Sequence, residues 1–236
     1  MQEVKYEDLG MIPYRQAWEM QEALLSENLA AKTSARQAAV ALPADATATQ
    51  HHFLVCEHPH VYTLGKNGSL SNLLLTPDQL EERGIAFFNS NRGGDITYHG
   101  PQQLVGYPVL DLEKIYTDIG KYLRNLEEVI IRVIAEFGIN GGRSEGETGV
   151  WLDPTIPGKE RKICAIGVRC SRWVTMHGFA LNVNTDLSYF DHIIPCGIQN
   201  KQVTSIERET GQRADMQLVK HTVKKHFEEV FEVRWR

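Results

Sequence analysis

Two residues with distinctive neighbours, Lys162 in KICAIG and Cys196 in PCGI, are the best candidates in this chain for covalent chemistry. A cysteine attacks a carbonyl carbon as its thiolate, and a nearby ammonium lowers the pKa of the thiol from about 8.5 into a range of roughly 3.5–7.5. Such a pair could take up an acyl group and pass it on. A buried, unreactive cysteine and a solvent-exposed lysine would look the same in the sequence, so the assignment needs support from other residues.

The segment NRGGDITYHGP, residues 91–101, is a candidate for ligand binding. Adjacent Gly93 and Gly94 allow positive φ angles and let backbone N–H groups approach a ligand closely. A decorated hairpin turn is the alternative reading. The chain contains neither GxGxxG nor GxxxxGK[ST], so no nucleotide-binding loop is predicted. A thioester donor needs no ATP for transfer, whereas a free acid does, so the sequence favours acyl transfer over ligation.

Metal binding is the main alternative for these residue types. Cys56, His58 and His60 alternate along one stretch, but a proline interrupts them, and neither CxxC nor HExxH is present. We therefore expect no metal and no other cofactor. His99 and His177 each precede a glycine, and the sequence leaves open whether they are core histidines or proton shuttles.

Composition limits the possible classes of protein. A chain of 236 residues with 42% hydrophobic residues can bury a sizeable core, and no boundary or repeat divides it, so we expect one catalytic domain over residues 1–236. The net charge of −5 argues against general nucleic-acid binding. The first residues show no signal peptide, and no apolar run reaches the roughly 18 residues of a membrane span. We expect a cytoplasmic protein with free thiols and no membrane association.

Two basic clusters could meet an acidic partner, although each could equally be a solvated face. The clusters comprise Arg143, Lys159, Arg161, Lys162, Arg169 and Arg172, and, on the last helix, Lys220, Lys224 and Lys225.

The elements that must position these residues mix helices and strands without strict alternation. Periodicity predicts a helix over 12–31, a mobile surface loop over 33–50 and a helix from Asp118 to Phe137. TGVWLD, KICAIGVRC and THGFALNV predict a meander of antiparallel strands. Further strands are expected at HHFLVCEH, IAFFNS and QLVGYPVLDL, and further helices at TPDQLEERG and from about Asp215 to Val230. The fold class is therefore α/β, with mixed, largely antiparallel sheets and packed helices.

Read in series, RGGDITYHGP with LVGYPVLDL after it, KICAIG, HGFALNV and PCGI resemble the octanoyltransferases of lipoate biosynthesis, the lipoyl(octanoyl) transferases. The resemblance extends from HFLVCEHPHVYTLGK through TSI at 204–206, which is more than half of the chain. The four motifs in this order are far more specific than any one alone.

This resemblance implies a catalytic domain of the biotin/lipoate ligase type. The reaction it implies moves octanoyl from octanoyl-acyl carrier protein to a lysine of a lipoyl domain, in 2-oxoacid dehydrogenase complexes or in the glycine cleavage H protein. Cys196 would carry the acyl thioester, and Lys162 would lower its pKa. The positions matching the substrate-contacting motifs are Arg92, Gly93, Gly94, Asp95, Ile96, Thr97, Tyr98, His99, Ala165, Ile166, Gly167, Gly178, Phe179 and Ala180.

One position departs from the family pattern. The usual HGPGQ is HGPQQ here, so Gln102 stands in place of a glycine and would be strained if its φ had to be positive. Three other functions remain open at this point. They are an ATP-dependent lipoate or biotin ligase, a non-catalytic acyl-binding module on the same fold, and an amidotransferase that moves octanoyl between lipoyl domains.

Overall fold

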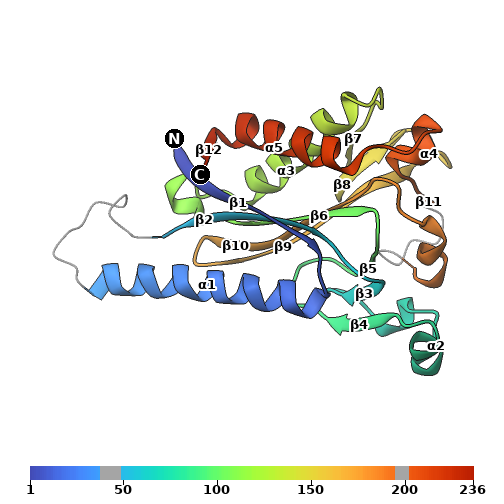
Figure 1. Ribbon diagram of the computed structural model, residues 1–236, viewed down its shortest axis with the longest axis horizontal. Coiled ribbons are helices and arrows are strands. Elements are labelled where there is room, and N and C mark those ends of the chain that lie inside the picture. The colour runs from blue at the N-terminus through green and yellow to red at the C-terminus, as the bar shows by residue number, and fades with distance from the viewer. Residues whose placement is uncertain (38–48, 195–201) are drawn as a thin grey trace.

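The computed structural model describes residues 1–37, 49–194 and 202–236, in which a large mixed sheet lies between helices on both faces (Figure 1). Helix α1 (Tyr14–Gln37) covers one face, and α3 (Ile119–Ala135) and α5 (Met216–Phe231) pack together on the other. The main hydrophobic core lies between the sheet and the α3–α5 pair, where the Phe53 and Phe227 rings stack with centroids 4.4 Å apart.

The main sheet is antiparallel through its centre. In spatial order its strands are β12 (Val233–Trp235), β1 (Gln2–Met11), β2 (His51–Glu57), β6 (Gln103–Val109), β10 (Val174–Asn182), β9 (Arg161–Ser171), β8 (Glu147–Leu152) and β7 (Gly142–Ser144). The pairs β12–β1 and β1–β2 are parallel, and the short β11 (Gln202–Val203) also joins β9 in parallel. The expected α/β class with largely antiparallel sheets is thus confirmed.

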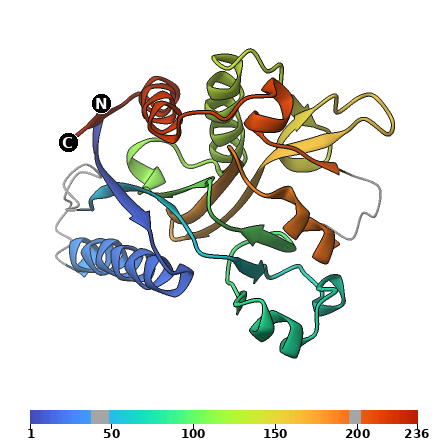
Figure 2. The same cartoon turned by 45° about the vertical axis from the view of Figure 1, so that its right-hand side comes forward.

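A second, smaller sheet lies beside the main one, together with α2 (Pro77–Glu82) (Figure 2). It consists of β4 (Ala86–Asn89), β3 (Val61–Leu64) and β5 (Ile96–His99), with β3 central. The remaining helical segments of residues 1–37, 49–194 and 202–236 are short. They are η2 (Leu70–Asn72), η3 (Leu112–Lys114), η4 (Leu187–His192) and α4 (Ile206–Thr210).

The predicted starts of α2 and α3 are confirmed by their caps. Thr76 and Gln79 form a reciprocal capping box at α2, and the Asp118 side chain accepts a hydrogen bond from the N–H of Lys121 at the start of α3. Within the described part of the chain, every helix is too short or too polar to cross a lipid bilayer.

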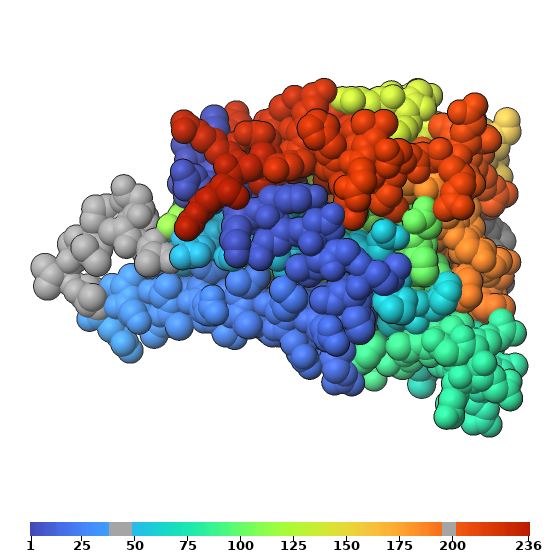
Figure 3. Space-filling model, in the orientation of Figure 1, coloured from blue at the N-terminus to red at the C-terminus, as the bar shows by residue number. Residues whose placement is uncertain are grey.

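One sequence expectation at the N-terminal end is wrong, and one element there was not predicted. The acidic first residues, for which no element was predicted, form β1, which lies between β2 and the C-terminal β12; Figure 3 shows the two chain ends packed together. The predicted mobile loop 33–50 begins too early, because α1 continues through Gln37. Residues 38–48 of that prediction lie outside the described residues.

Buried polar pairs explain why α1 extends beyond residue 31, where its apolar pattern ends. Lys32, only 2% exposed, forms an ion pair with Asp111 at 2.6 Å, and the hydroxyl of Thr49 donates to the same carboxylate at 2.9 Å. Asn28 exchanges two hydrogen bonds with the backbone of Gln50. These contacts tie the last turns of α1 to the sheet without apolar side chains, so hydrophobic periodicity could not reveal them.

Gln102, between β5 and β6, has the left-handed backbone that the family's glycine would favour, with φ at 62°. Its N–H donates to Glu57 Oε2 at 2.6 Å, and its carbonyl accepts from the N–H of Asn184 and the hydroxyl of Thr185. Its side-chain carbonyl accepts from Asn184 Nδ2 at 2.8 Å and from Arg213 Nη2 at 2.9 Å. Hydrogen bonds available only to a side chain therefore offset the strain at this position.

We predict that Gln102→Ala destabilises the protein more than Gln102→Gly. Both variants lose the two side-chain hydrogen bonds, each worth about 0.5–1.5 kcal/mol, but only glycine also relieves a left-handed penalty of roughly 1–2 kcal/mol. Urea denaturation should therefore give the glycine variant a free energy of unfolding about 1 kcal/mol higher than that of the alanine variant. Equal stabilities, or a less stable glycine variant, would show that φ strain at this residue is negligible.

Candidate active site

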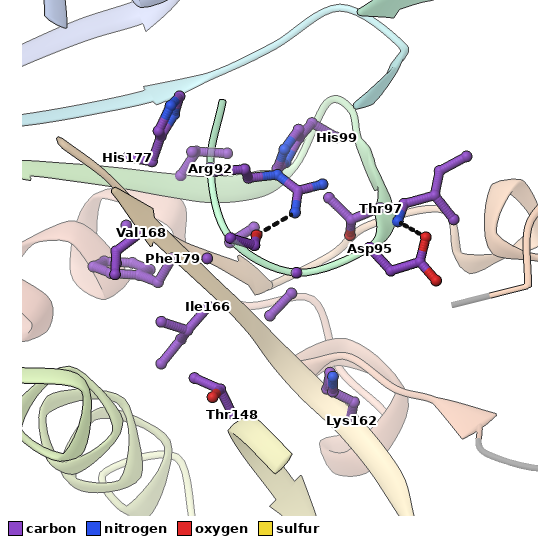
Figure 4. Close-up of a pocket in the computed structure, with 18 of the residues that line it drawn as sticks. Arg92, Asp95, Thr97, His99, Thr148, Lys162, Ile166, Val168, His177 and Phe179 are labelled. Carbon is purple, nitrogen blue, oxygen red and sulfur yellow. Dashed lines mark hydrogen bonds between the residues drawn. The ribbon is translucent and has the colours of Figure 1, made fainter. Parts of the chain in front are cut away.

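A cavity of about 440 Å³ lies over β9 and β10, beneath the loop that carries residues 92–97 (Figure 4). Of the fourteen predicted substrate-binding positions, all but Tyr98 line it. The structure therefore brings residues 92–99 next to residues 165–167 and 178–180, which lie far from them in the sequence.

The floor of the cavity is a pair of antiparallel strands in register. Ala165 lies opposite Ala180, Ile166 opposite Phe179, and Gly167 opposite Gly178. The AIG and GFA motifs are therefore cross-strand partners, which explains why their spacing in the sequence carries no periodic signal. The small and apolar side chains of this floor suit a hydrocarbon chain.

The glycine loop approaches this floor closely. The N–H of Gly93 donates to the carbonyl of Val168 at 2.9 Å, and a Cβ atom at Gly167 would lie only 2.8 Å from the Gly93 carbonyl oxygen. Glycine at 167 is thus required for the loop to approach the strand. Gly94 has a φ of 85°, a left-handed backbone that glycine adopts without strain.

Polar contacts fix the charged residues of the loop. Arg92 Nη2 donates to the carbonyl of Thr63 at 2.6 Å and to its hydroxyl at 3.0 Å. Asp95 accepts from Asn72 Nδ2 and from the N–H of Ile96, both at 2.6 Å. The loop is therefore anchored to β3 on one side and to η2 on the other.

Tyr98 lies away from the cavity. It is fully buried, its hydroxyl is hydrogen-bonded to His60 Nδ1 at 2.7 Å, and its ring stacks on Tyr189. Alternation along β5 turns this side chain to the opposite face from Thr97 and His99. The motif match could not reveal this, because it treats the segment as one unit.

Lys162 lies on β9 at the opposite end of the lining from Val168 and Phe179, as Figure 4 shows. Its Nζ lies 4.5 Å from the centre of the Trp151 ring. Cys196 lies outside the described residues. The chain on either side of residues 195–201 is attached near the cavity, since the N–H of Ile194 donates to the carbonyl of Asn72 and β11 places Val203 beside Lys162.

The two histidines of the lining are neutral. Burial lowers the pKa of His99 well below its usual value, and burial together with the charges of Arg92 and Arg169 lowers the pKa of His177 to about 3. His99 Nδ1–H donates to Gln103 Oε1 at 2.8 Å, and His177 Nε2–H donates to Asn91 Oδ1 at 2.7 Å. Neither imidazole is charged near pH 7.

A chain of buried amides links His99 to the neighbourhood of Lys162. Gln103 Nε2 donates to Asn182 Oδ1 at 2.9 Å, and Asn182 Nδ2 donates to the carbonyl of Thr204 at 3.0 Å. The N–H of Thr204 in turn donates to the carbonyl of Lys162 at 2.9 Å. Sequence reasoning missed Gln103 and Asn182, because a buried amide becomes recognisable only through its partners.

The residues considered for metal binding have other contacts. Cys56 Sγ lies 3.5 Å from His58 Nε2, which is hydrogen-bonded to the Tyr107 hydroxyl, whereas the His60 ring stacks on Tyr189. Among the residues that the structure describes, no three His, Cys, Asp or Glu side chains are grouped to hold an ion.

Ion pairs occupy most of the basic residues that sequence analysis grouped as docking candidates. Arg143 pairs with Glu127 and Glu128, Arg161 with Asp153 and Glu209, Arg169 with Glu22, Lys220 with Asp8, and Lys225 with Glu136. The Arg172 side chain bonds to the Leu29 carbonyl, and Lys224 lies over the rings of Tyr6 and Trp235. These residues therefore do not form two unpaired cationic surfaces.

Comparisons with known proteins agree with the fold and the motifs. The family model of the lipoyl protein ligase A/B catalytic domain matches residues 13–228. A protein named octanoyltransferase from Flavobacterium johnsoniae is 56% identical, with 97% of each chain covered, and one from Cytophaga hutchinsonii is 53% identical, with 98% of this chain and 93% of the relative covered.

Solved structures share the architecture at low identity. A bi-partite lipoate protein ligase from Thermoplasma acidophilum has a TM-score of 0.69 at 16% identity, covering 100% of this chain and 86% of its own. A lipoate-protein ligase A bound with ATP has a TM-score of 0.67 at 14% identity, covering 100% of this chain and 87% of its own. By its family match and its similarity to octanoyltransferases over nearly its whole length, the chain belongs to the octanoyltransferases of the lipoyl protein ligase A/B catalytic domain family.

Proposed function

We propose that this chain is a single catalytic domain that transfers an octanoyl group from octanoyl-acyl carrier protein to a lysine of a lipoyl domain. The acceptor domains would be those of 2-oxoacid dehydrogenase complexes and of the glycine cleavage H protein. The observation that carries the proposal is the arrangement along β9, which bears Lys162 at one end of the cavity and the apolar AIG floor farther along. Similarity to relatives named octanoyltransferase supports the choice of acyl group.

The cavity can select for an acyl chain by burial. Each methylene removed from water contributes about 0.8 kcal/mol, so an octanoyl tail gains on the order of 5 kcal/mol over acetyl. Ile166, Val168 and Phe179 supply the apolar wall for such a tail. Selection against a chain one carbon longer or shorter would be much weaker.

The reaction proceeds in two steps through Cys196. The Cys196 thiolate attacks the thioester carbonyl carbon of the donor, a new C–S bond forms, and the C–S bond to the carrier breaks, so that the carrier leaves as a thiol after taking up the proton of the Lys162 ammonium. The amine of the acceptor lysine then attacks the acyl-cysteine. A C–N bond forms, Cys196 is released as thiolate, and the proton of the amine passes to Lys162 or to water.

Lys162 has two tasks in this scheme. As an ammonium it stabilises the thiolate, and as an amine it can take the proton of the incoming lysine. The neutral His99 and His177 are hydrogen-bonded parts of the wall and carry no step of this scheme.

The fold also accommodates an ATP-dependent ligase, since a ligase bound with ATP has the same architecture. The two functions predict different requirements. A ligase uses free octanoate and ATP and does not need Cys196, whereas the proposed transferase uses the thioester alone. Octanoylation of a lipoyl domain from octanoyl-acyl carrier protein without ATP tests the proposal, and transfer that occurs only with octanoate and ATP would reject it.

We predict that Cys196→Ser abolishes this ATP-independent transfer and that Lys162→Ala lowers its rate by about 10² or more. Lys162→Arg should retain more activity than alanine, because it keeps the positive charge but cannot accept a proton. Mass spectrometry of the acceptor domain gives the rates. Cys170→Ser is the matched control, since Cys170 is an exposed thiol outside the cavity lining. Full activity of Cys196→Ser would remove the nucleophile assignment.

We predict that Ile166→Phe shifts the preference toward shorter acyl chains. The larger ring fills part of the cavity, and because each methylene displaced from it forfeits about 0.8 kcal/mol, displacing two methylenes should lower kcat/KM for octanoyl about tenfold while that for butanoyl changes little. A series of acyl-acyl carrier proteins measures the profile. Ile131→Phe, on α3 and outside the lining, is the control. An unchanged profile would mean that the tail lies elsewhere.

A further inference from the structure

The side chain beside the Lys162 ammonium is an aromatic ring and not a carboxylate. Lys162 Nζ lies 4.5 Å from the centre of the Trp151 ring, and Trp151 is only 3% exposed. Within residues 1–37, 49–194 and 202–236, no carboxylate oxygen lies within 4.0 Å of this ammonium. The buried Glu127 is bound instead to Arg124 at 2.8 Å and to Arg143 at 3.2 Å.

An irregularity in the sheet creates this contact. Val150 pairs with Cys164, but the register then shifts, so that Trp151 pairs with Lys162. Regular antiparallel pairing would place Ile163 opposite Trp151. A bulge of this kind redirects side chains, and here it places the indole directly across from the lysine.

Gly149 lies against the stem of the lysine and allows close pairing of the two strands. A Cβ atom at this position would be in ordinary contact with Lys162 Cε at 3.5 Å and Cδ at 3.6 Å, but it would clash with the carbonyl oxygen of Cys164 at 2.6 Å. Gly149 also has a φ of 126°, at which any residue with a side chain would be strained. Its N–H donates to Glu127 Oε1 at 3.0 Å, which fixes the strand beneath the lysine.

We propose that Trp151 is a positioning residue that holds the Lys162 ammonium at the cavity wall while leaving its charge available to an anion. An aromatic face attracts a cation through its quadrupole and carries no net charge. A carboxylate at the same place would fix the lysine equally well, but it would cancel the field that stabilises a thiolate. This inference rests on the proposed function, in which Lys162 supports the nucleophile.

The test compares Trp151→Phe and Trp151→Leu in steady-state octanoyl transfer from octanoyl-acyl carrier protein to a lipoyl domain. Trp151→Leu should lower kcat by about 3- to 30-fold, with the donor KM changed less than about twofold, because the ring acts on the lysine and not on donor binding. Trp151→Phe keeps an aromatic face and should recover most of the lost rate.

The matched control is Trp235→Leu. Trp235 also has a lysine over its ring, with Lys224 Nζ at 5.4 Å, but it lies outside the cavity lining. This variant should turn over at the rate of the unmodified protein. Equal kcat in Trp151→Leu and the unmodified protein would overturn the inference, as would a Trp151→Phe variant as slow as the leucine variant.

Should Trp151→Leu fail to fold, tryptophans of increasing fluorination at position 151 provide the decisive series. Fluorine weakens the ring quadrupole with little change in shape, so kcat should fall stepwise, and a flat series would overturn the inference. Transfer by the unmodified protein distinguishes failure of the proposed function from failure of the role of Trp151. If it does not transfer octanoyl from the carrier, the proposed function fails, whereas transfer that is insensitive to the ring rejects only the role of Trp151.

Discussion

The register of β9 between its two neighbours is the constraint on which the site depends. Pairing with β10 places the AIG and GFA motifs opposite each other as the cavity floor. Pairing with β8, shifted by one irregularity, places Trp151 across from Lys162. A slip of one residue would turn each floor side chain to the other face and separate the lysine from its ring. The sheet therefore positions the acyl chain and the charge together.

The loops above the floor are anchored by polar contacts that leave few groups unsatisfied. Arg92 is fixed to Thr63, Asp95 to Asn72, and Gln102 to the segment around Asn184. The buried amides of Gln103 and Asn182 continue this network to the backbone beside Lys162. Because a partly satisfied network would cost more than an apolar contact, these residues specify one arrangement of the cavity wall.

Sequence predicted the local elements where one physical signal was dominant. Capping residues located α2 and α3, and alternation located β8, β9 and β10. Local sequence signals do not predict an element whose structure depends on partners distant in the sequence. The acidic N-terminal residues become a strand only because β2 and β12 lie on either side of them, and α1 extends to Gln37 on buried polar pairs.

The site shows the same division. The motifs that resemble octanoyltransferases named thirteen positions around one cavity, but Tyr98 belongs to the opposite face of its strand. Trp151 could not be found from sequence, because its contact with Lys162 follows from a shift of register. The basic clusters looked unpaired in sequence only because their acidic partners lie far away in the chain, as Arg161 and Glu209 do.

The measurement that tests the central claim most directly is the intact mass of the protein after incubation with octanoyl-acyl carrier protein in the absence of ATP, followed by peptide mapping. The account predicts one octanoyl group on Cys196, released by hydroxylamine and by a lipoyl domain. No adduct, together with acceptor acylation that requires octanoate and ATP, would contradict a transferase that works through an acyl-cysteine.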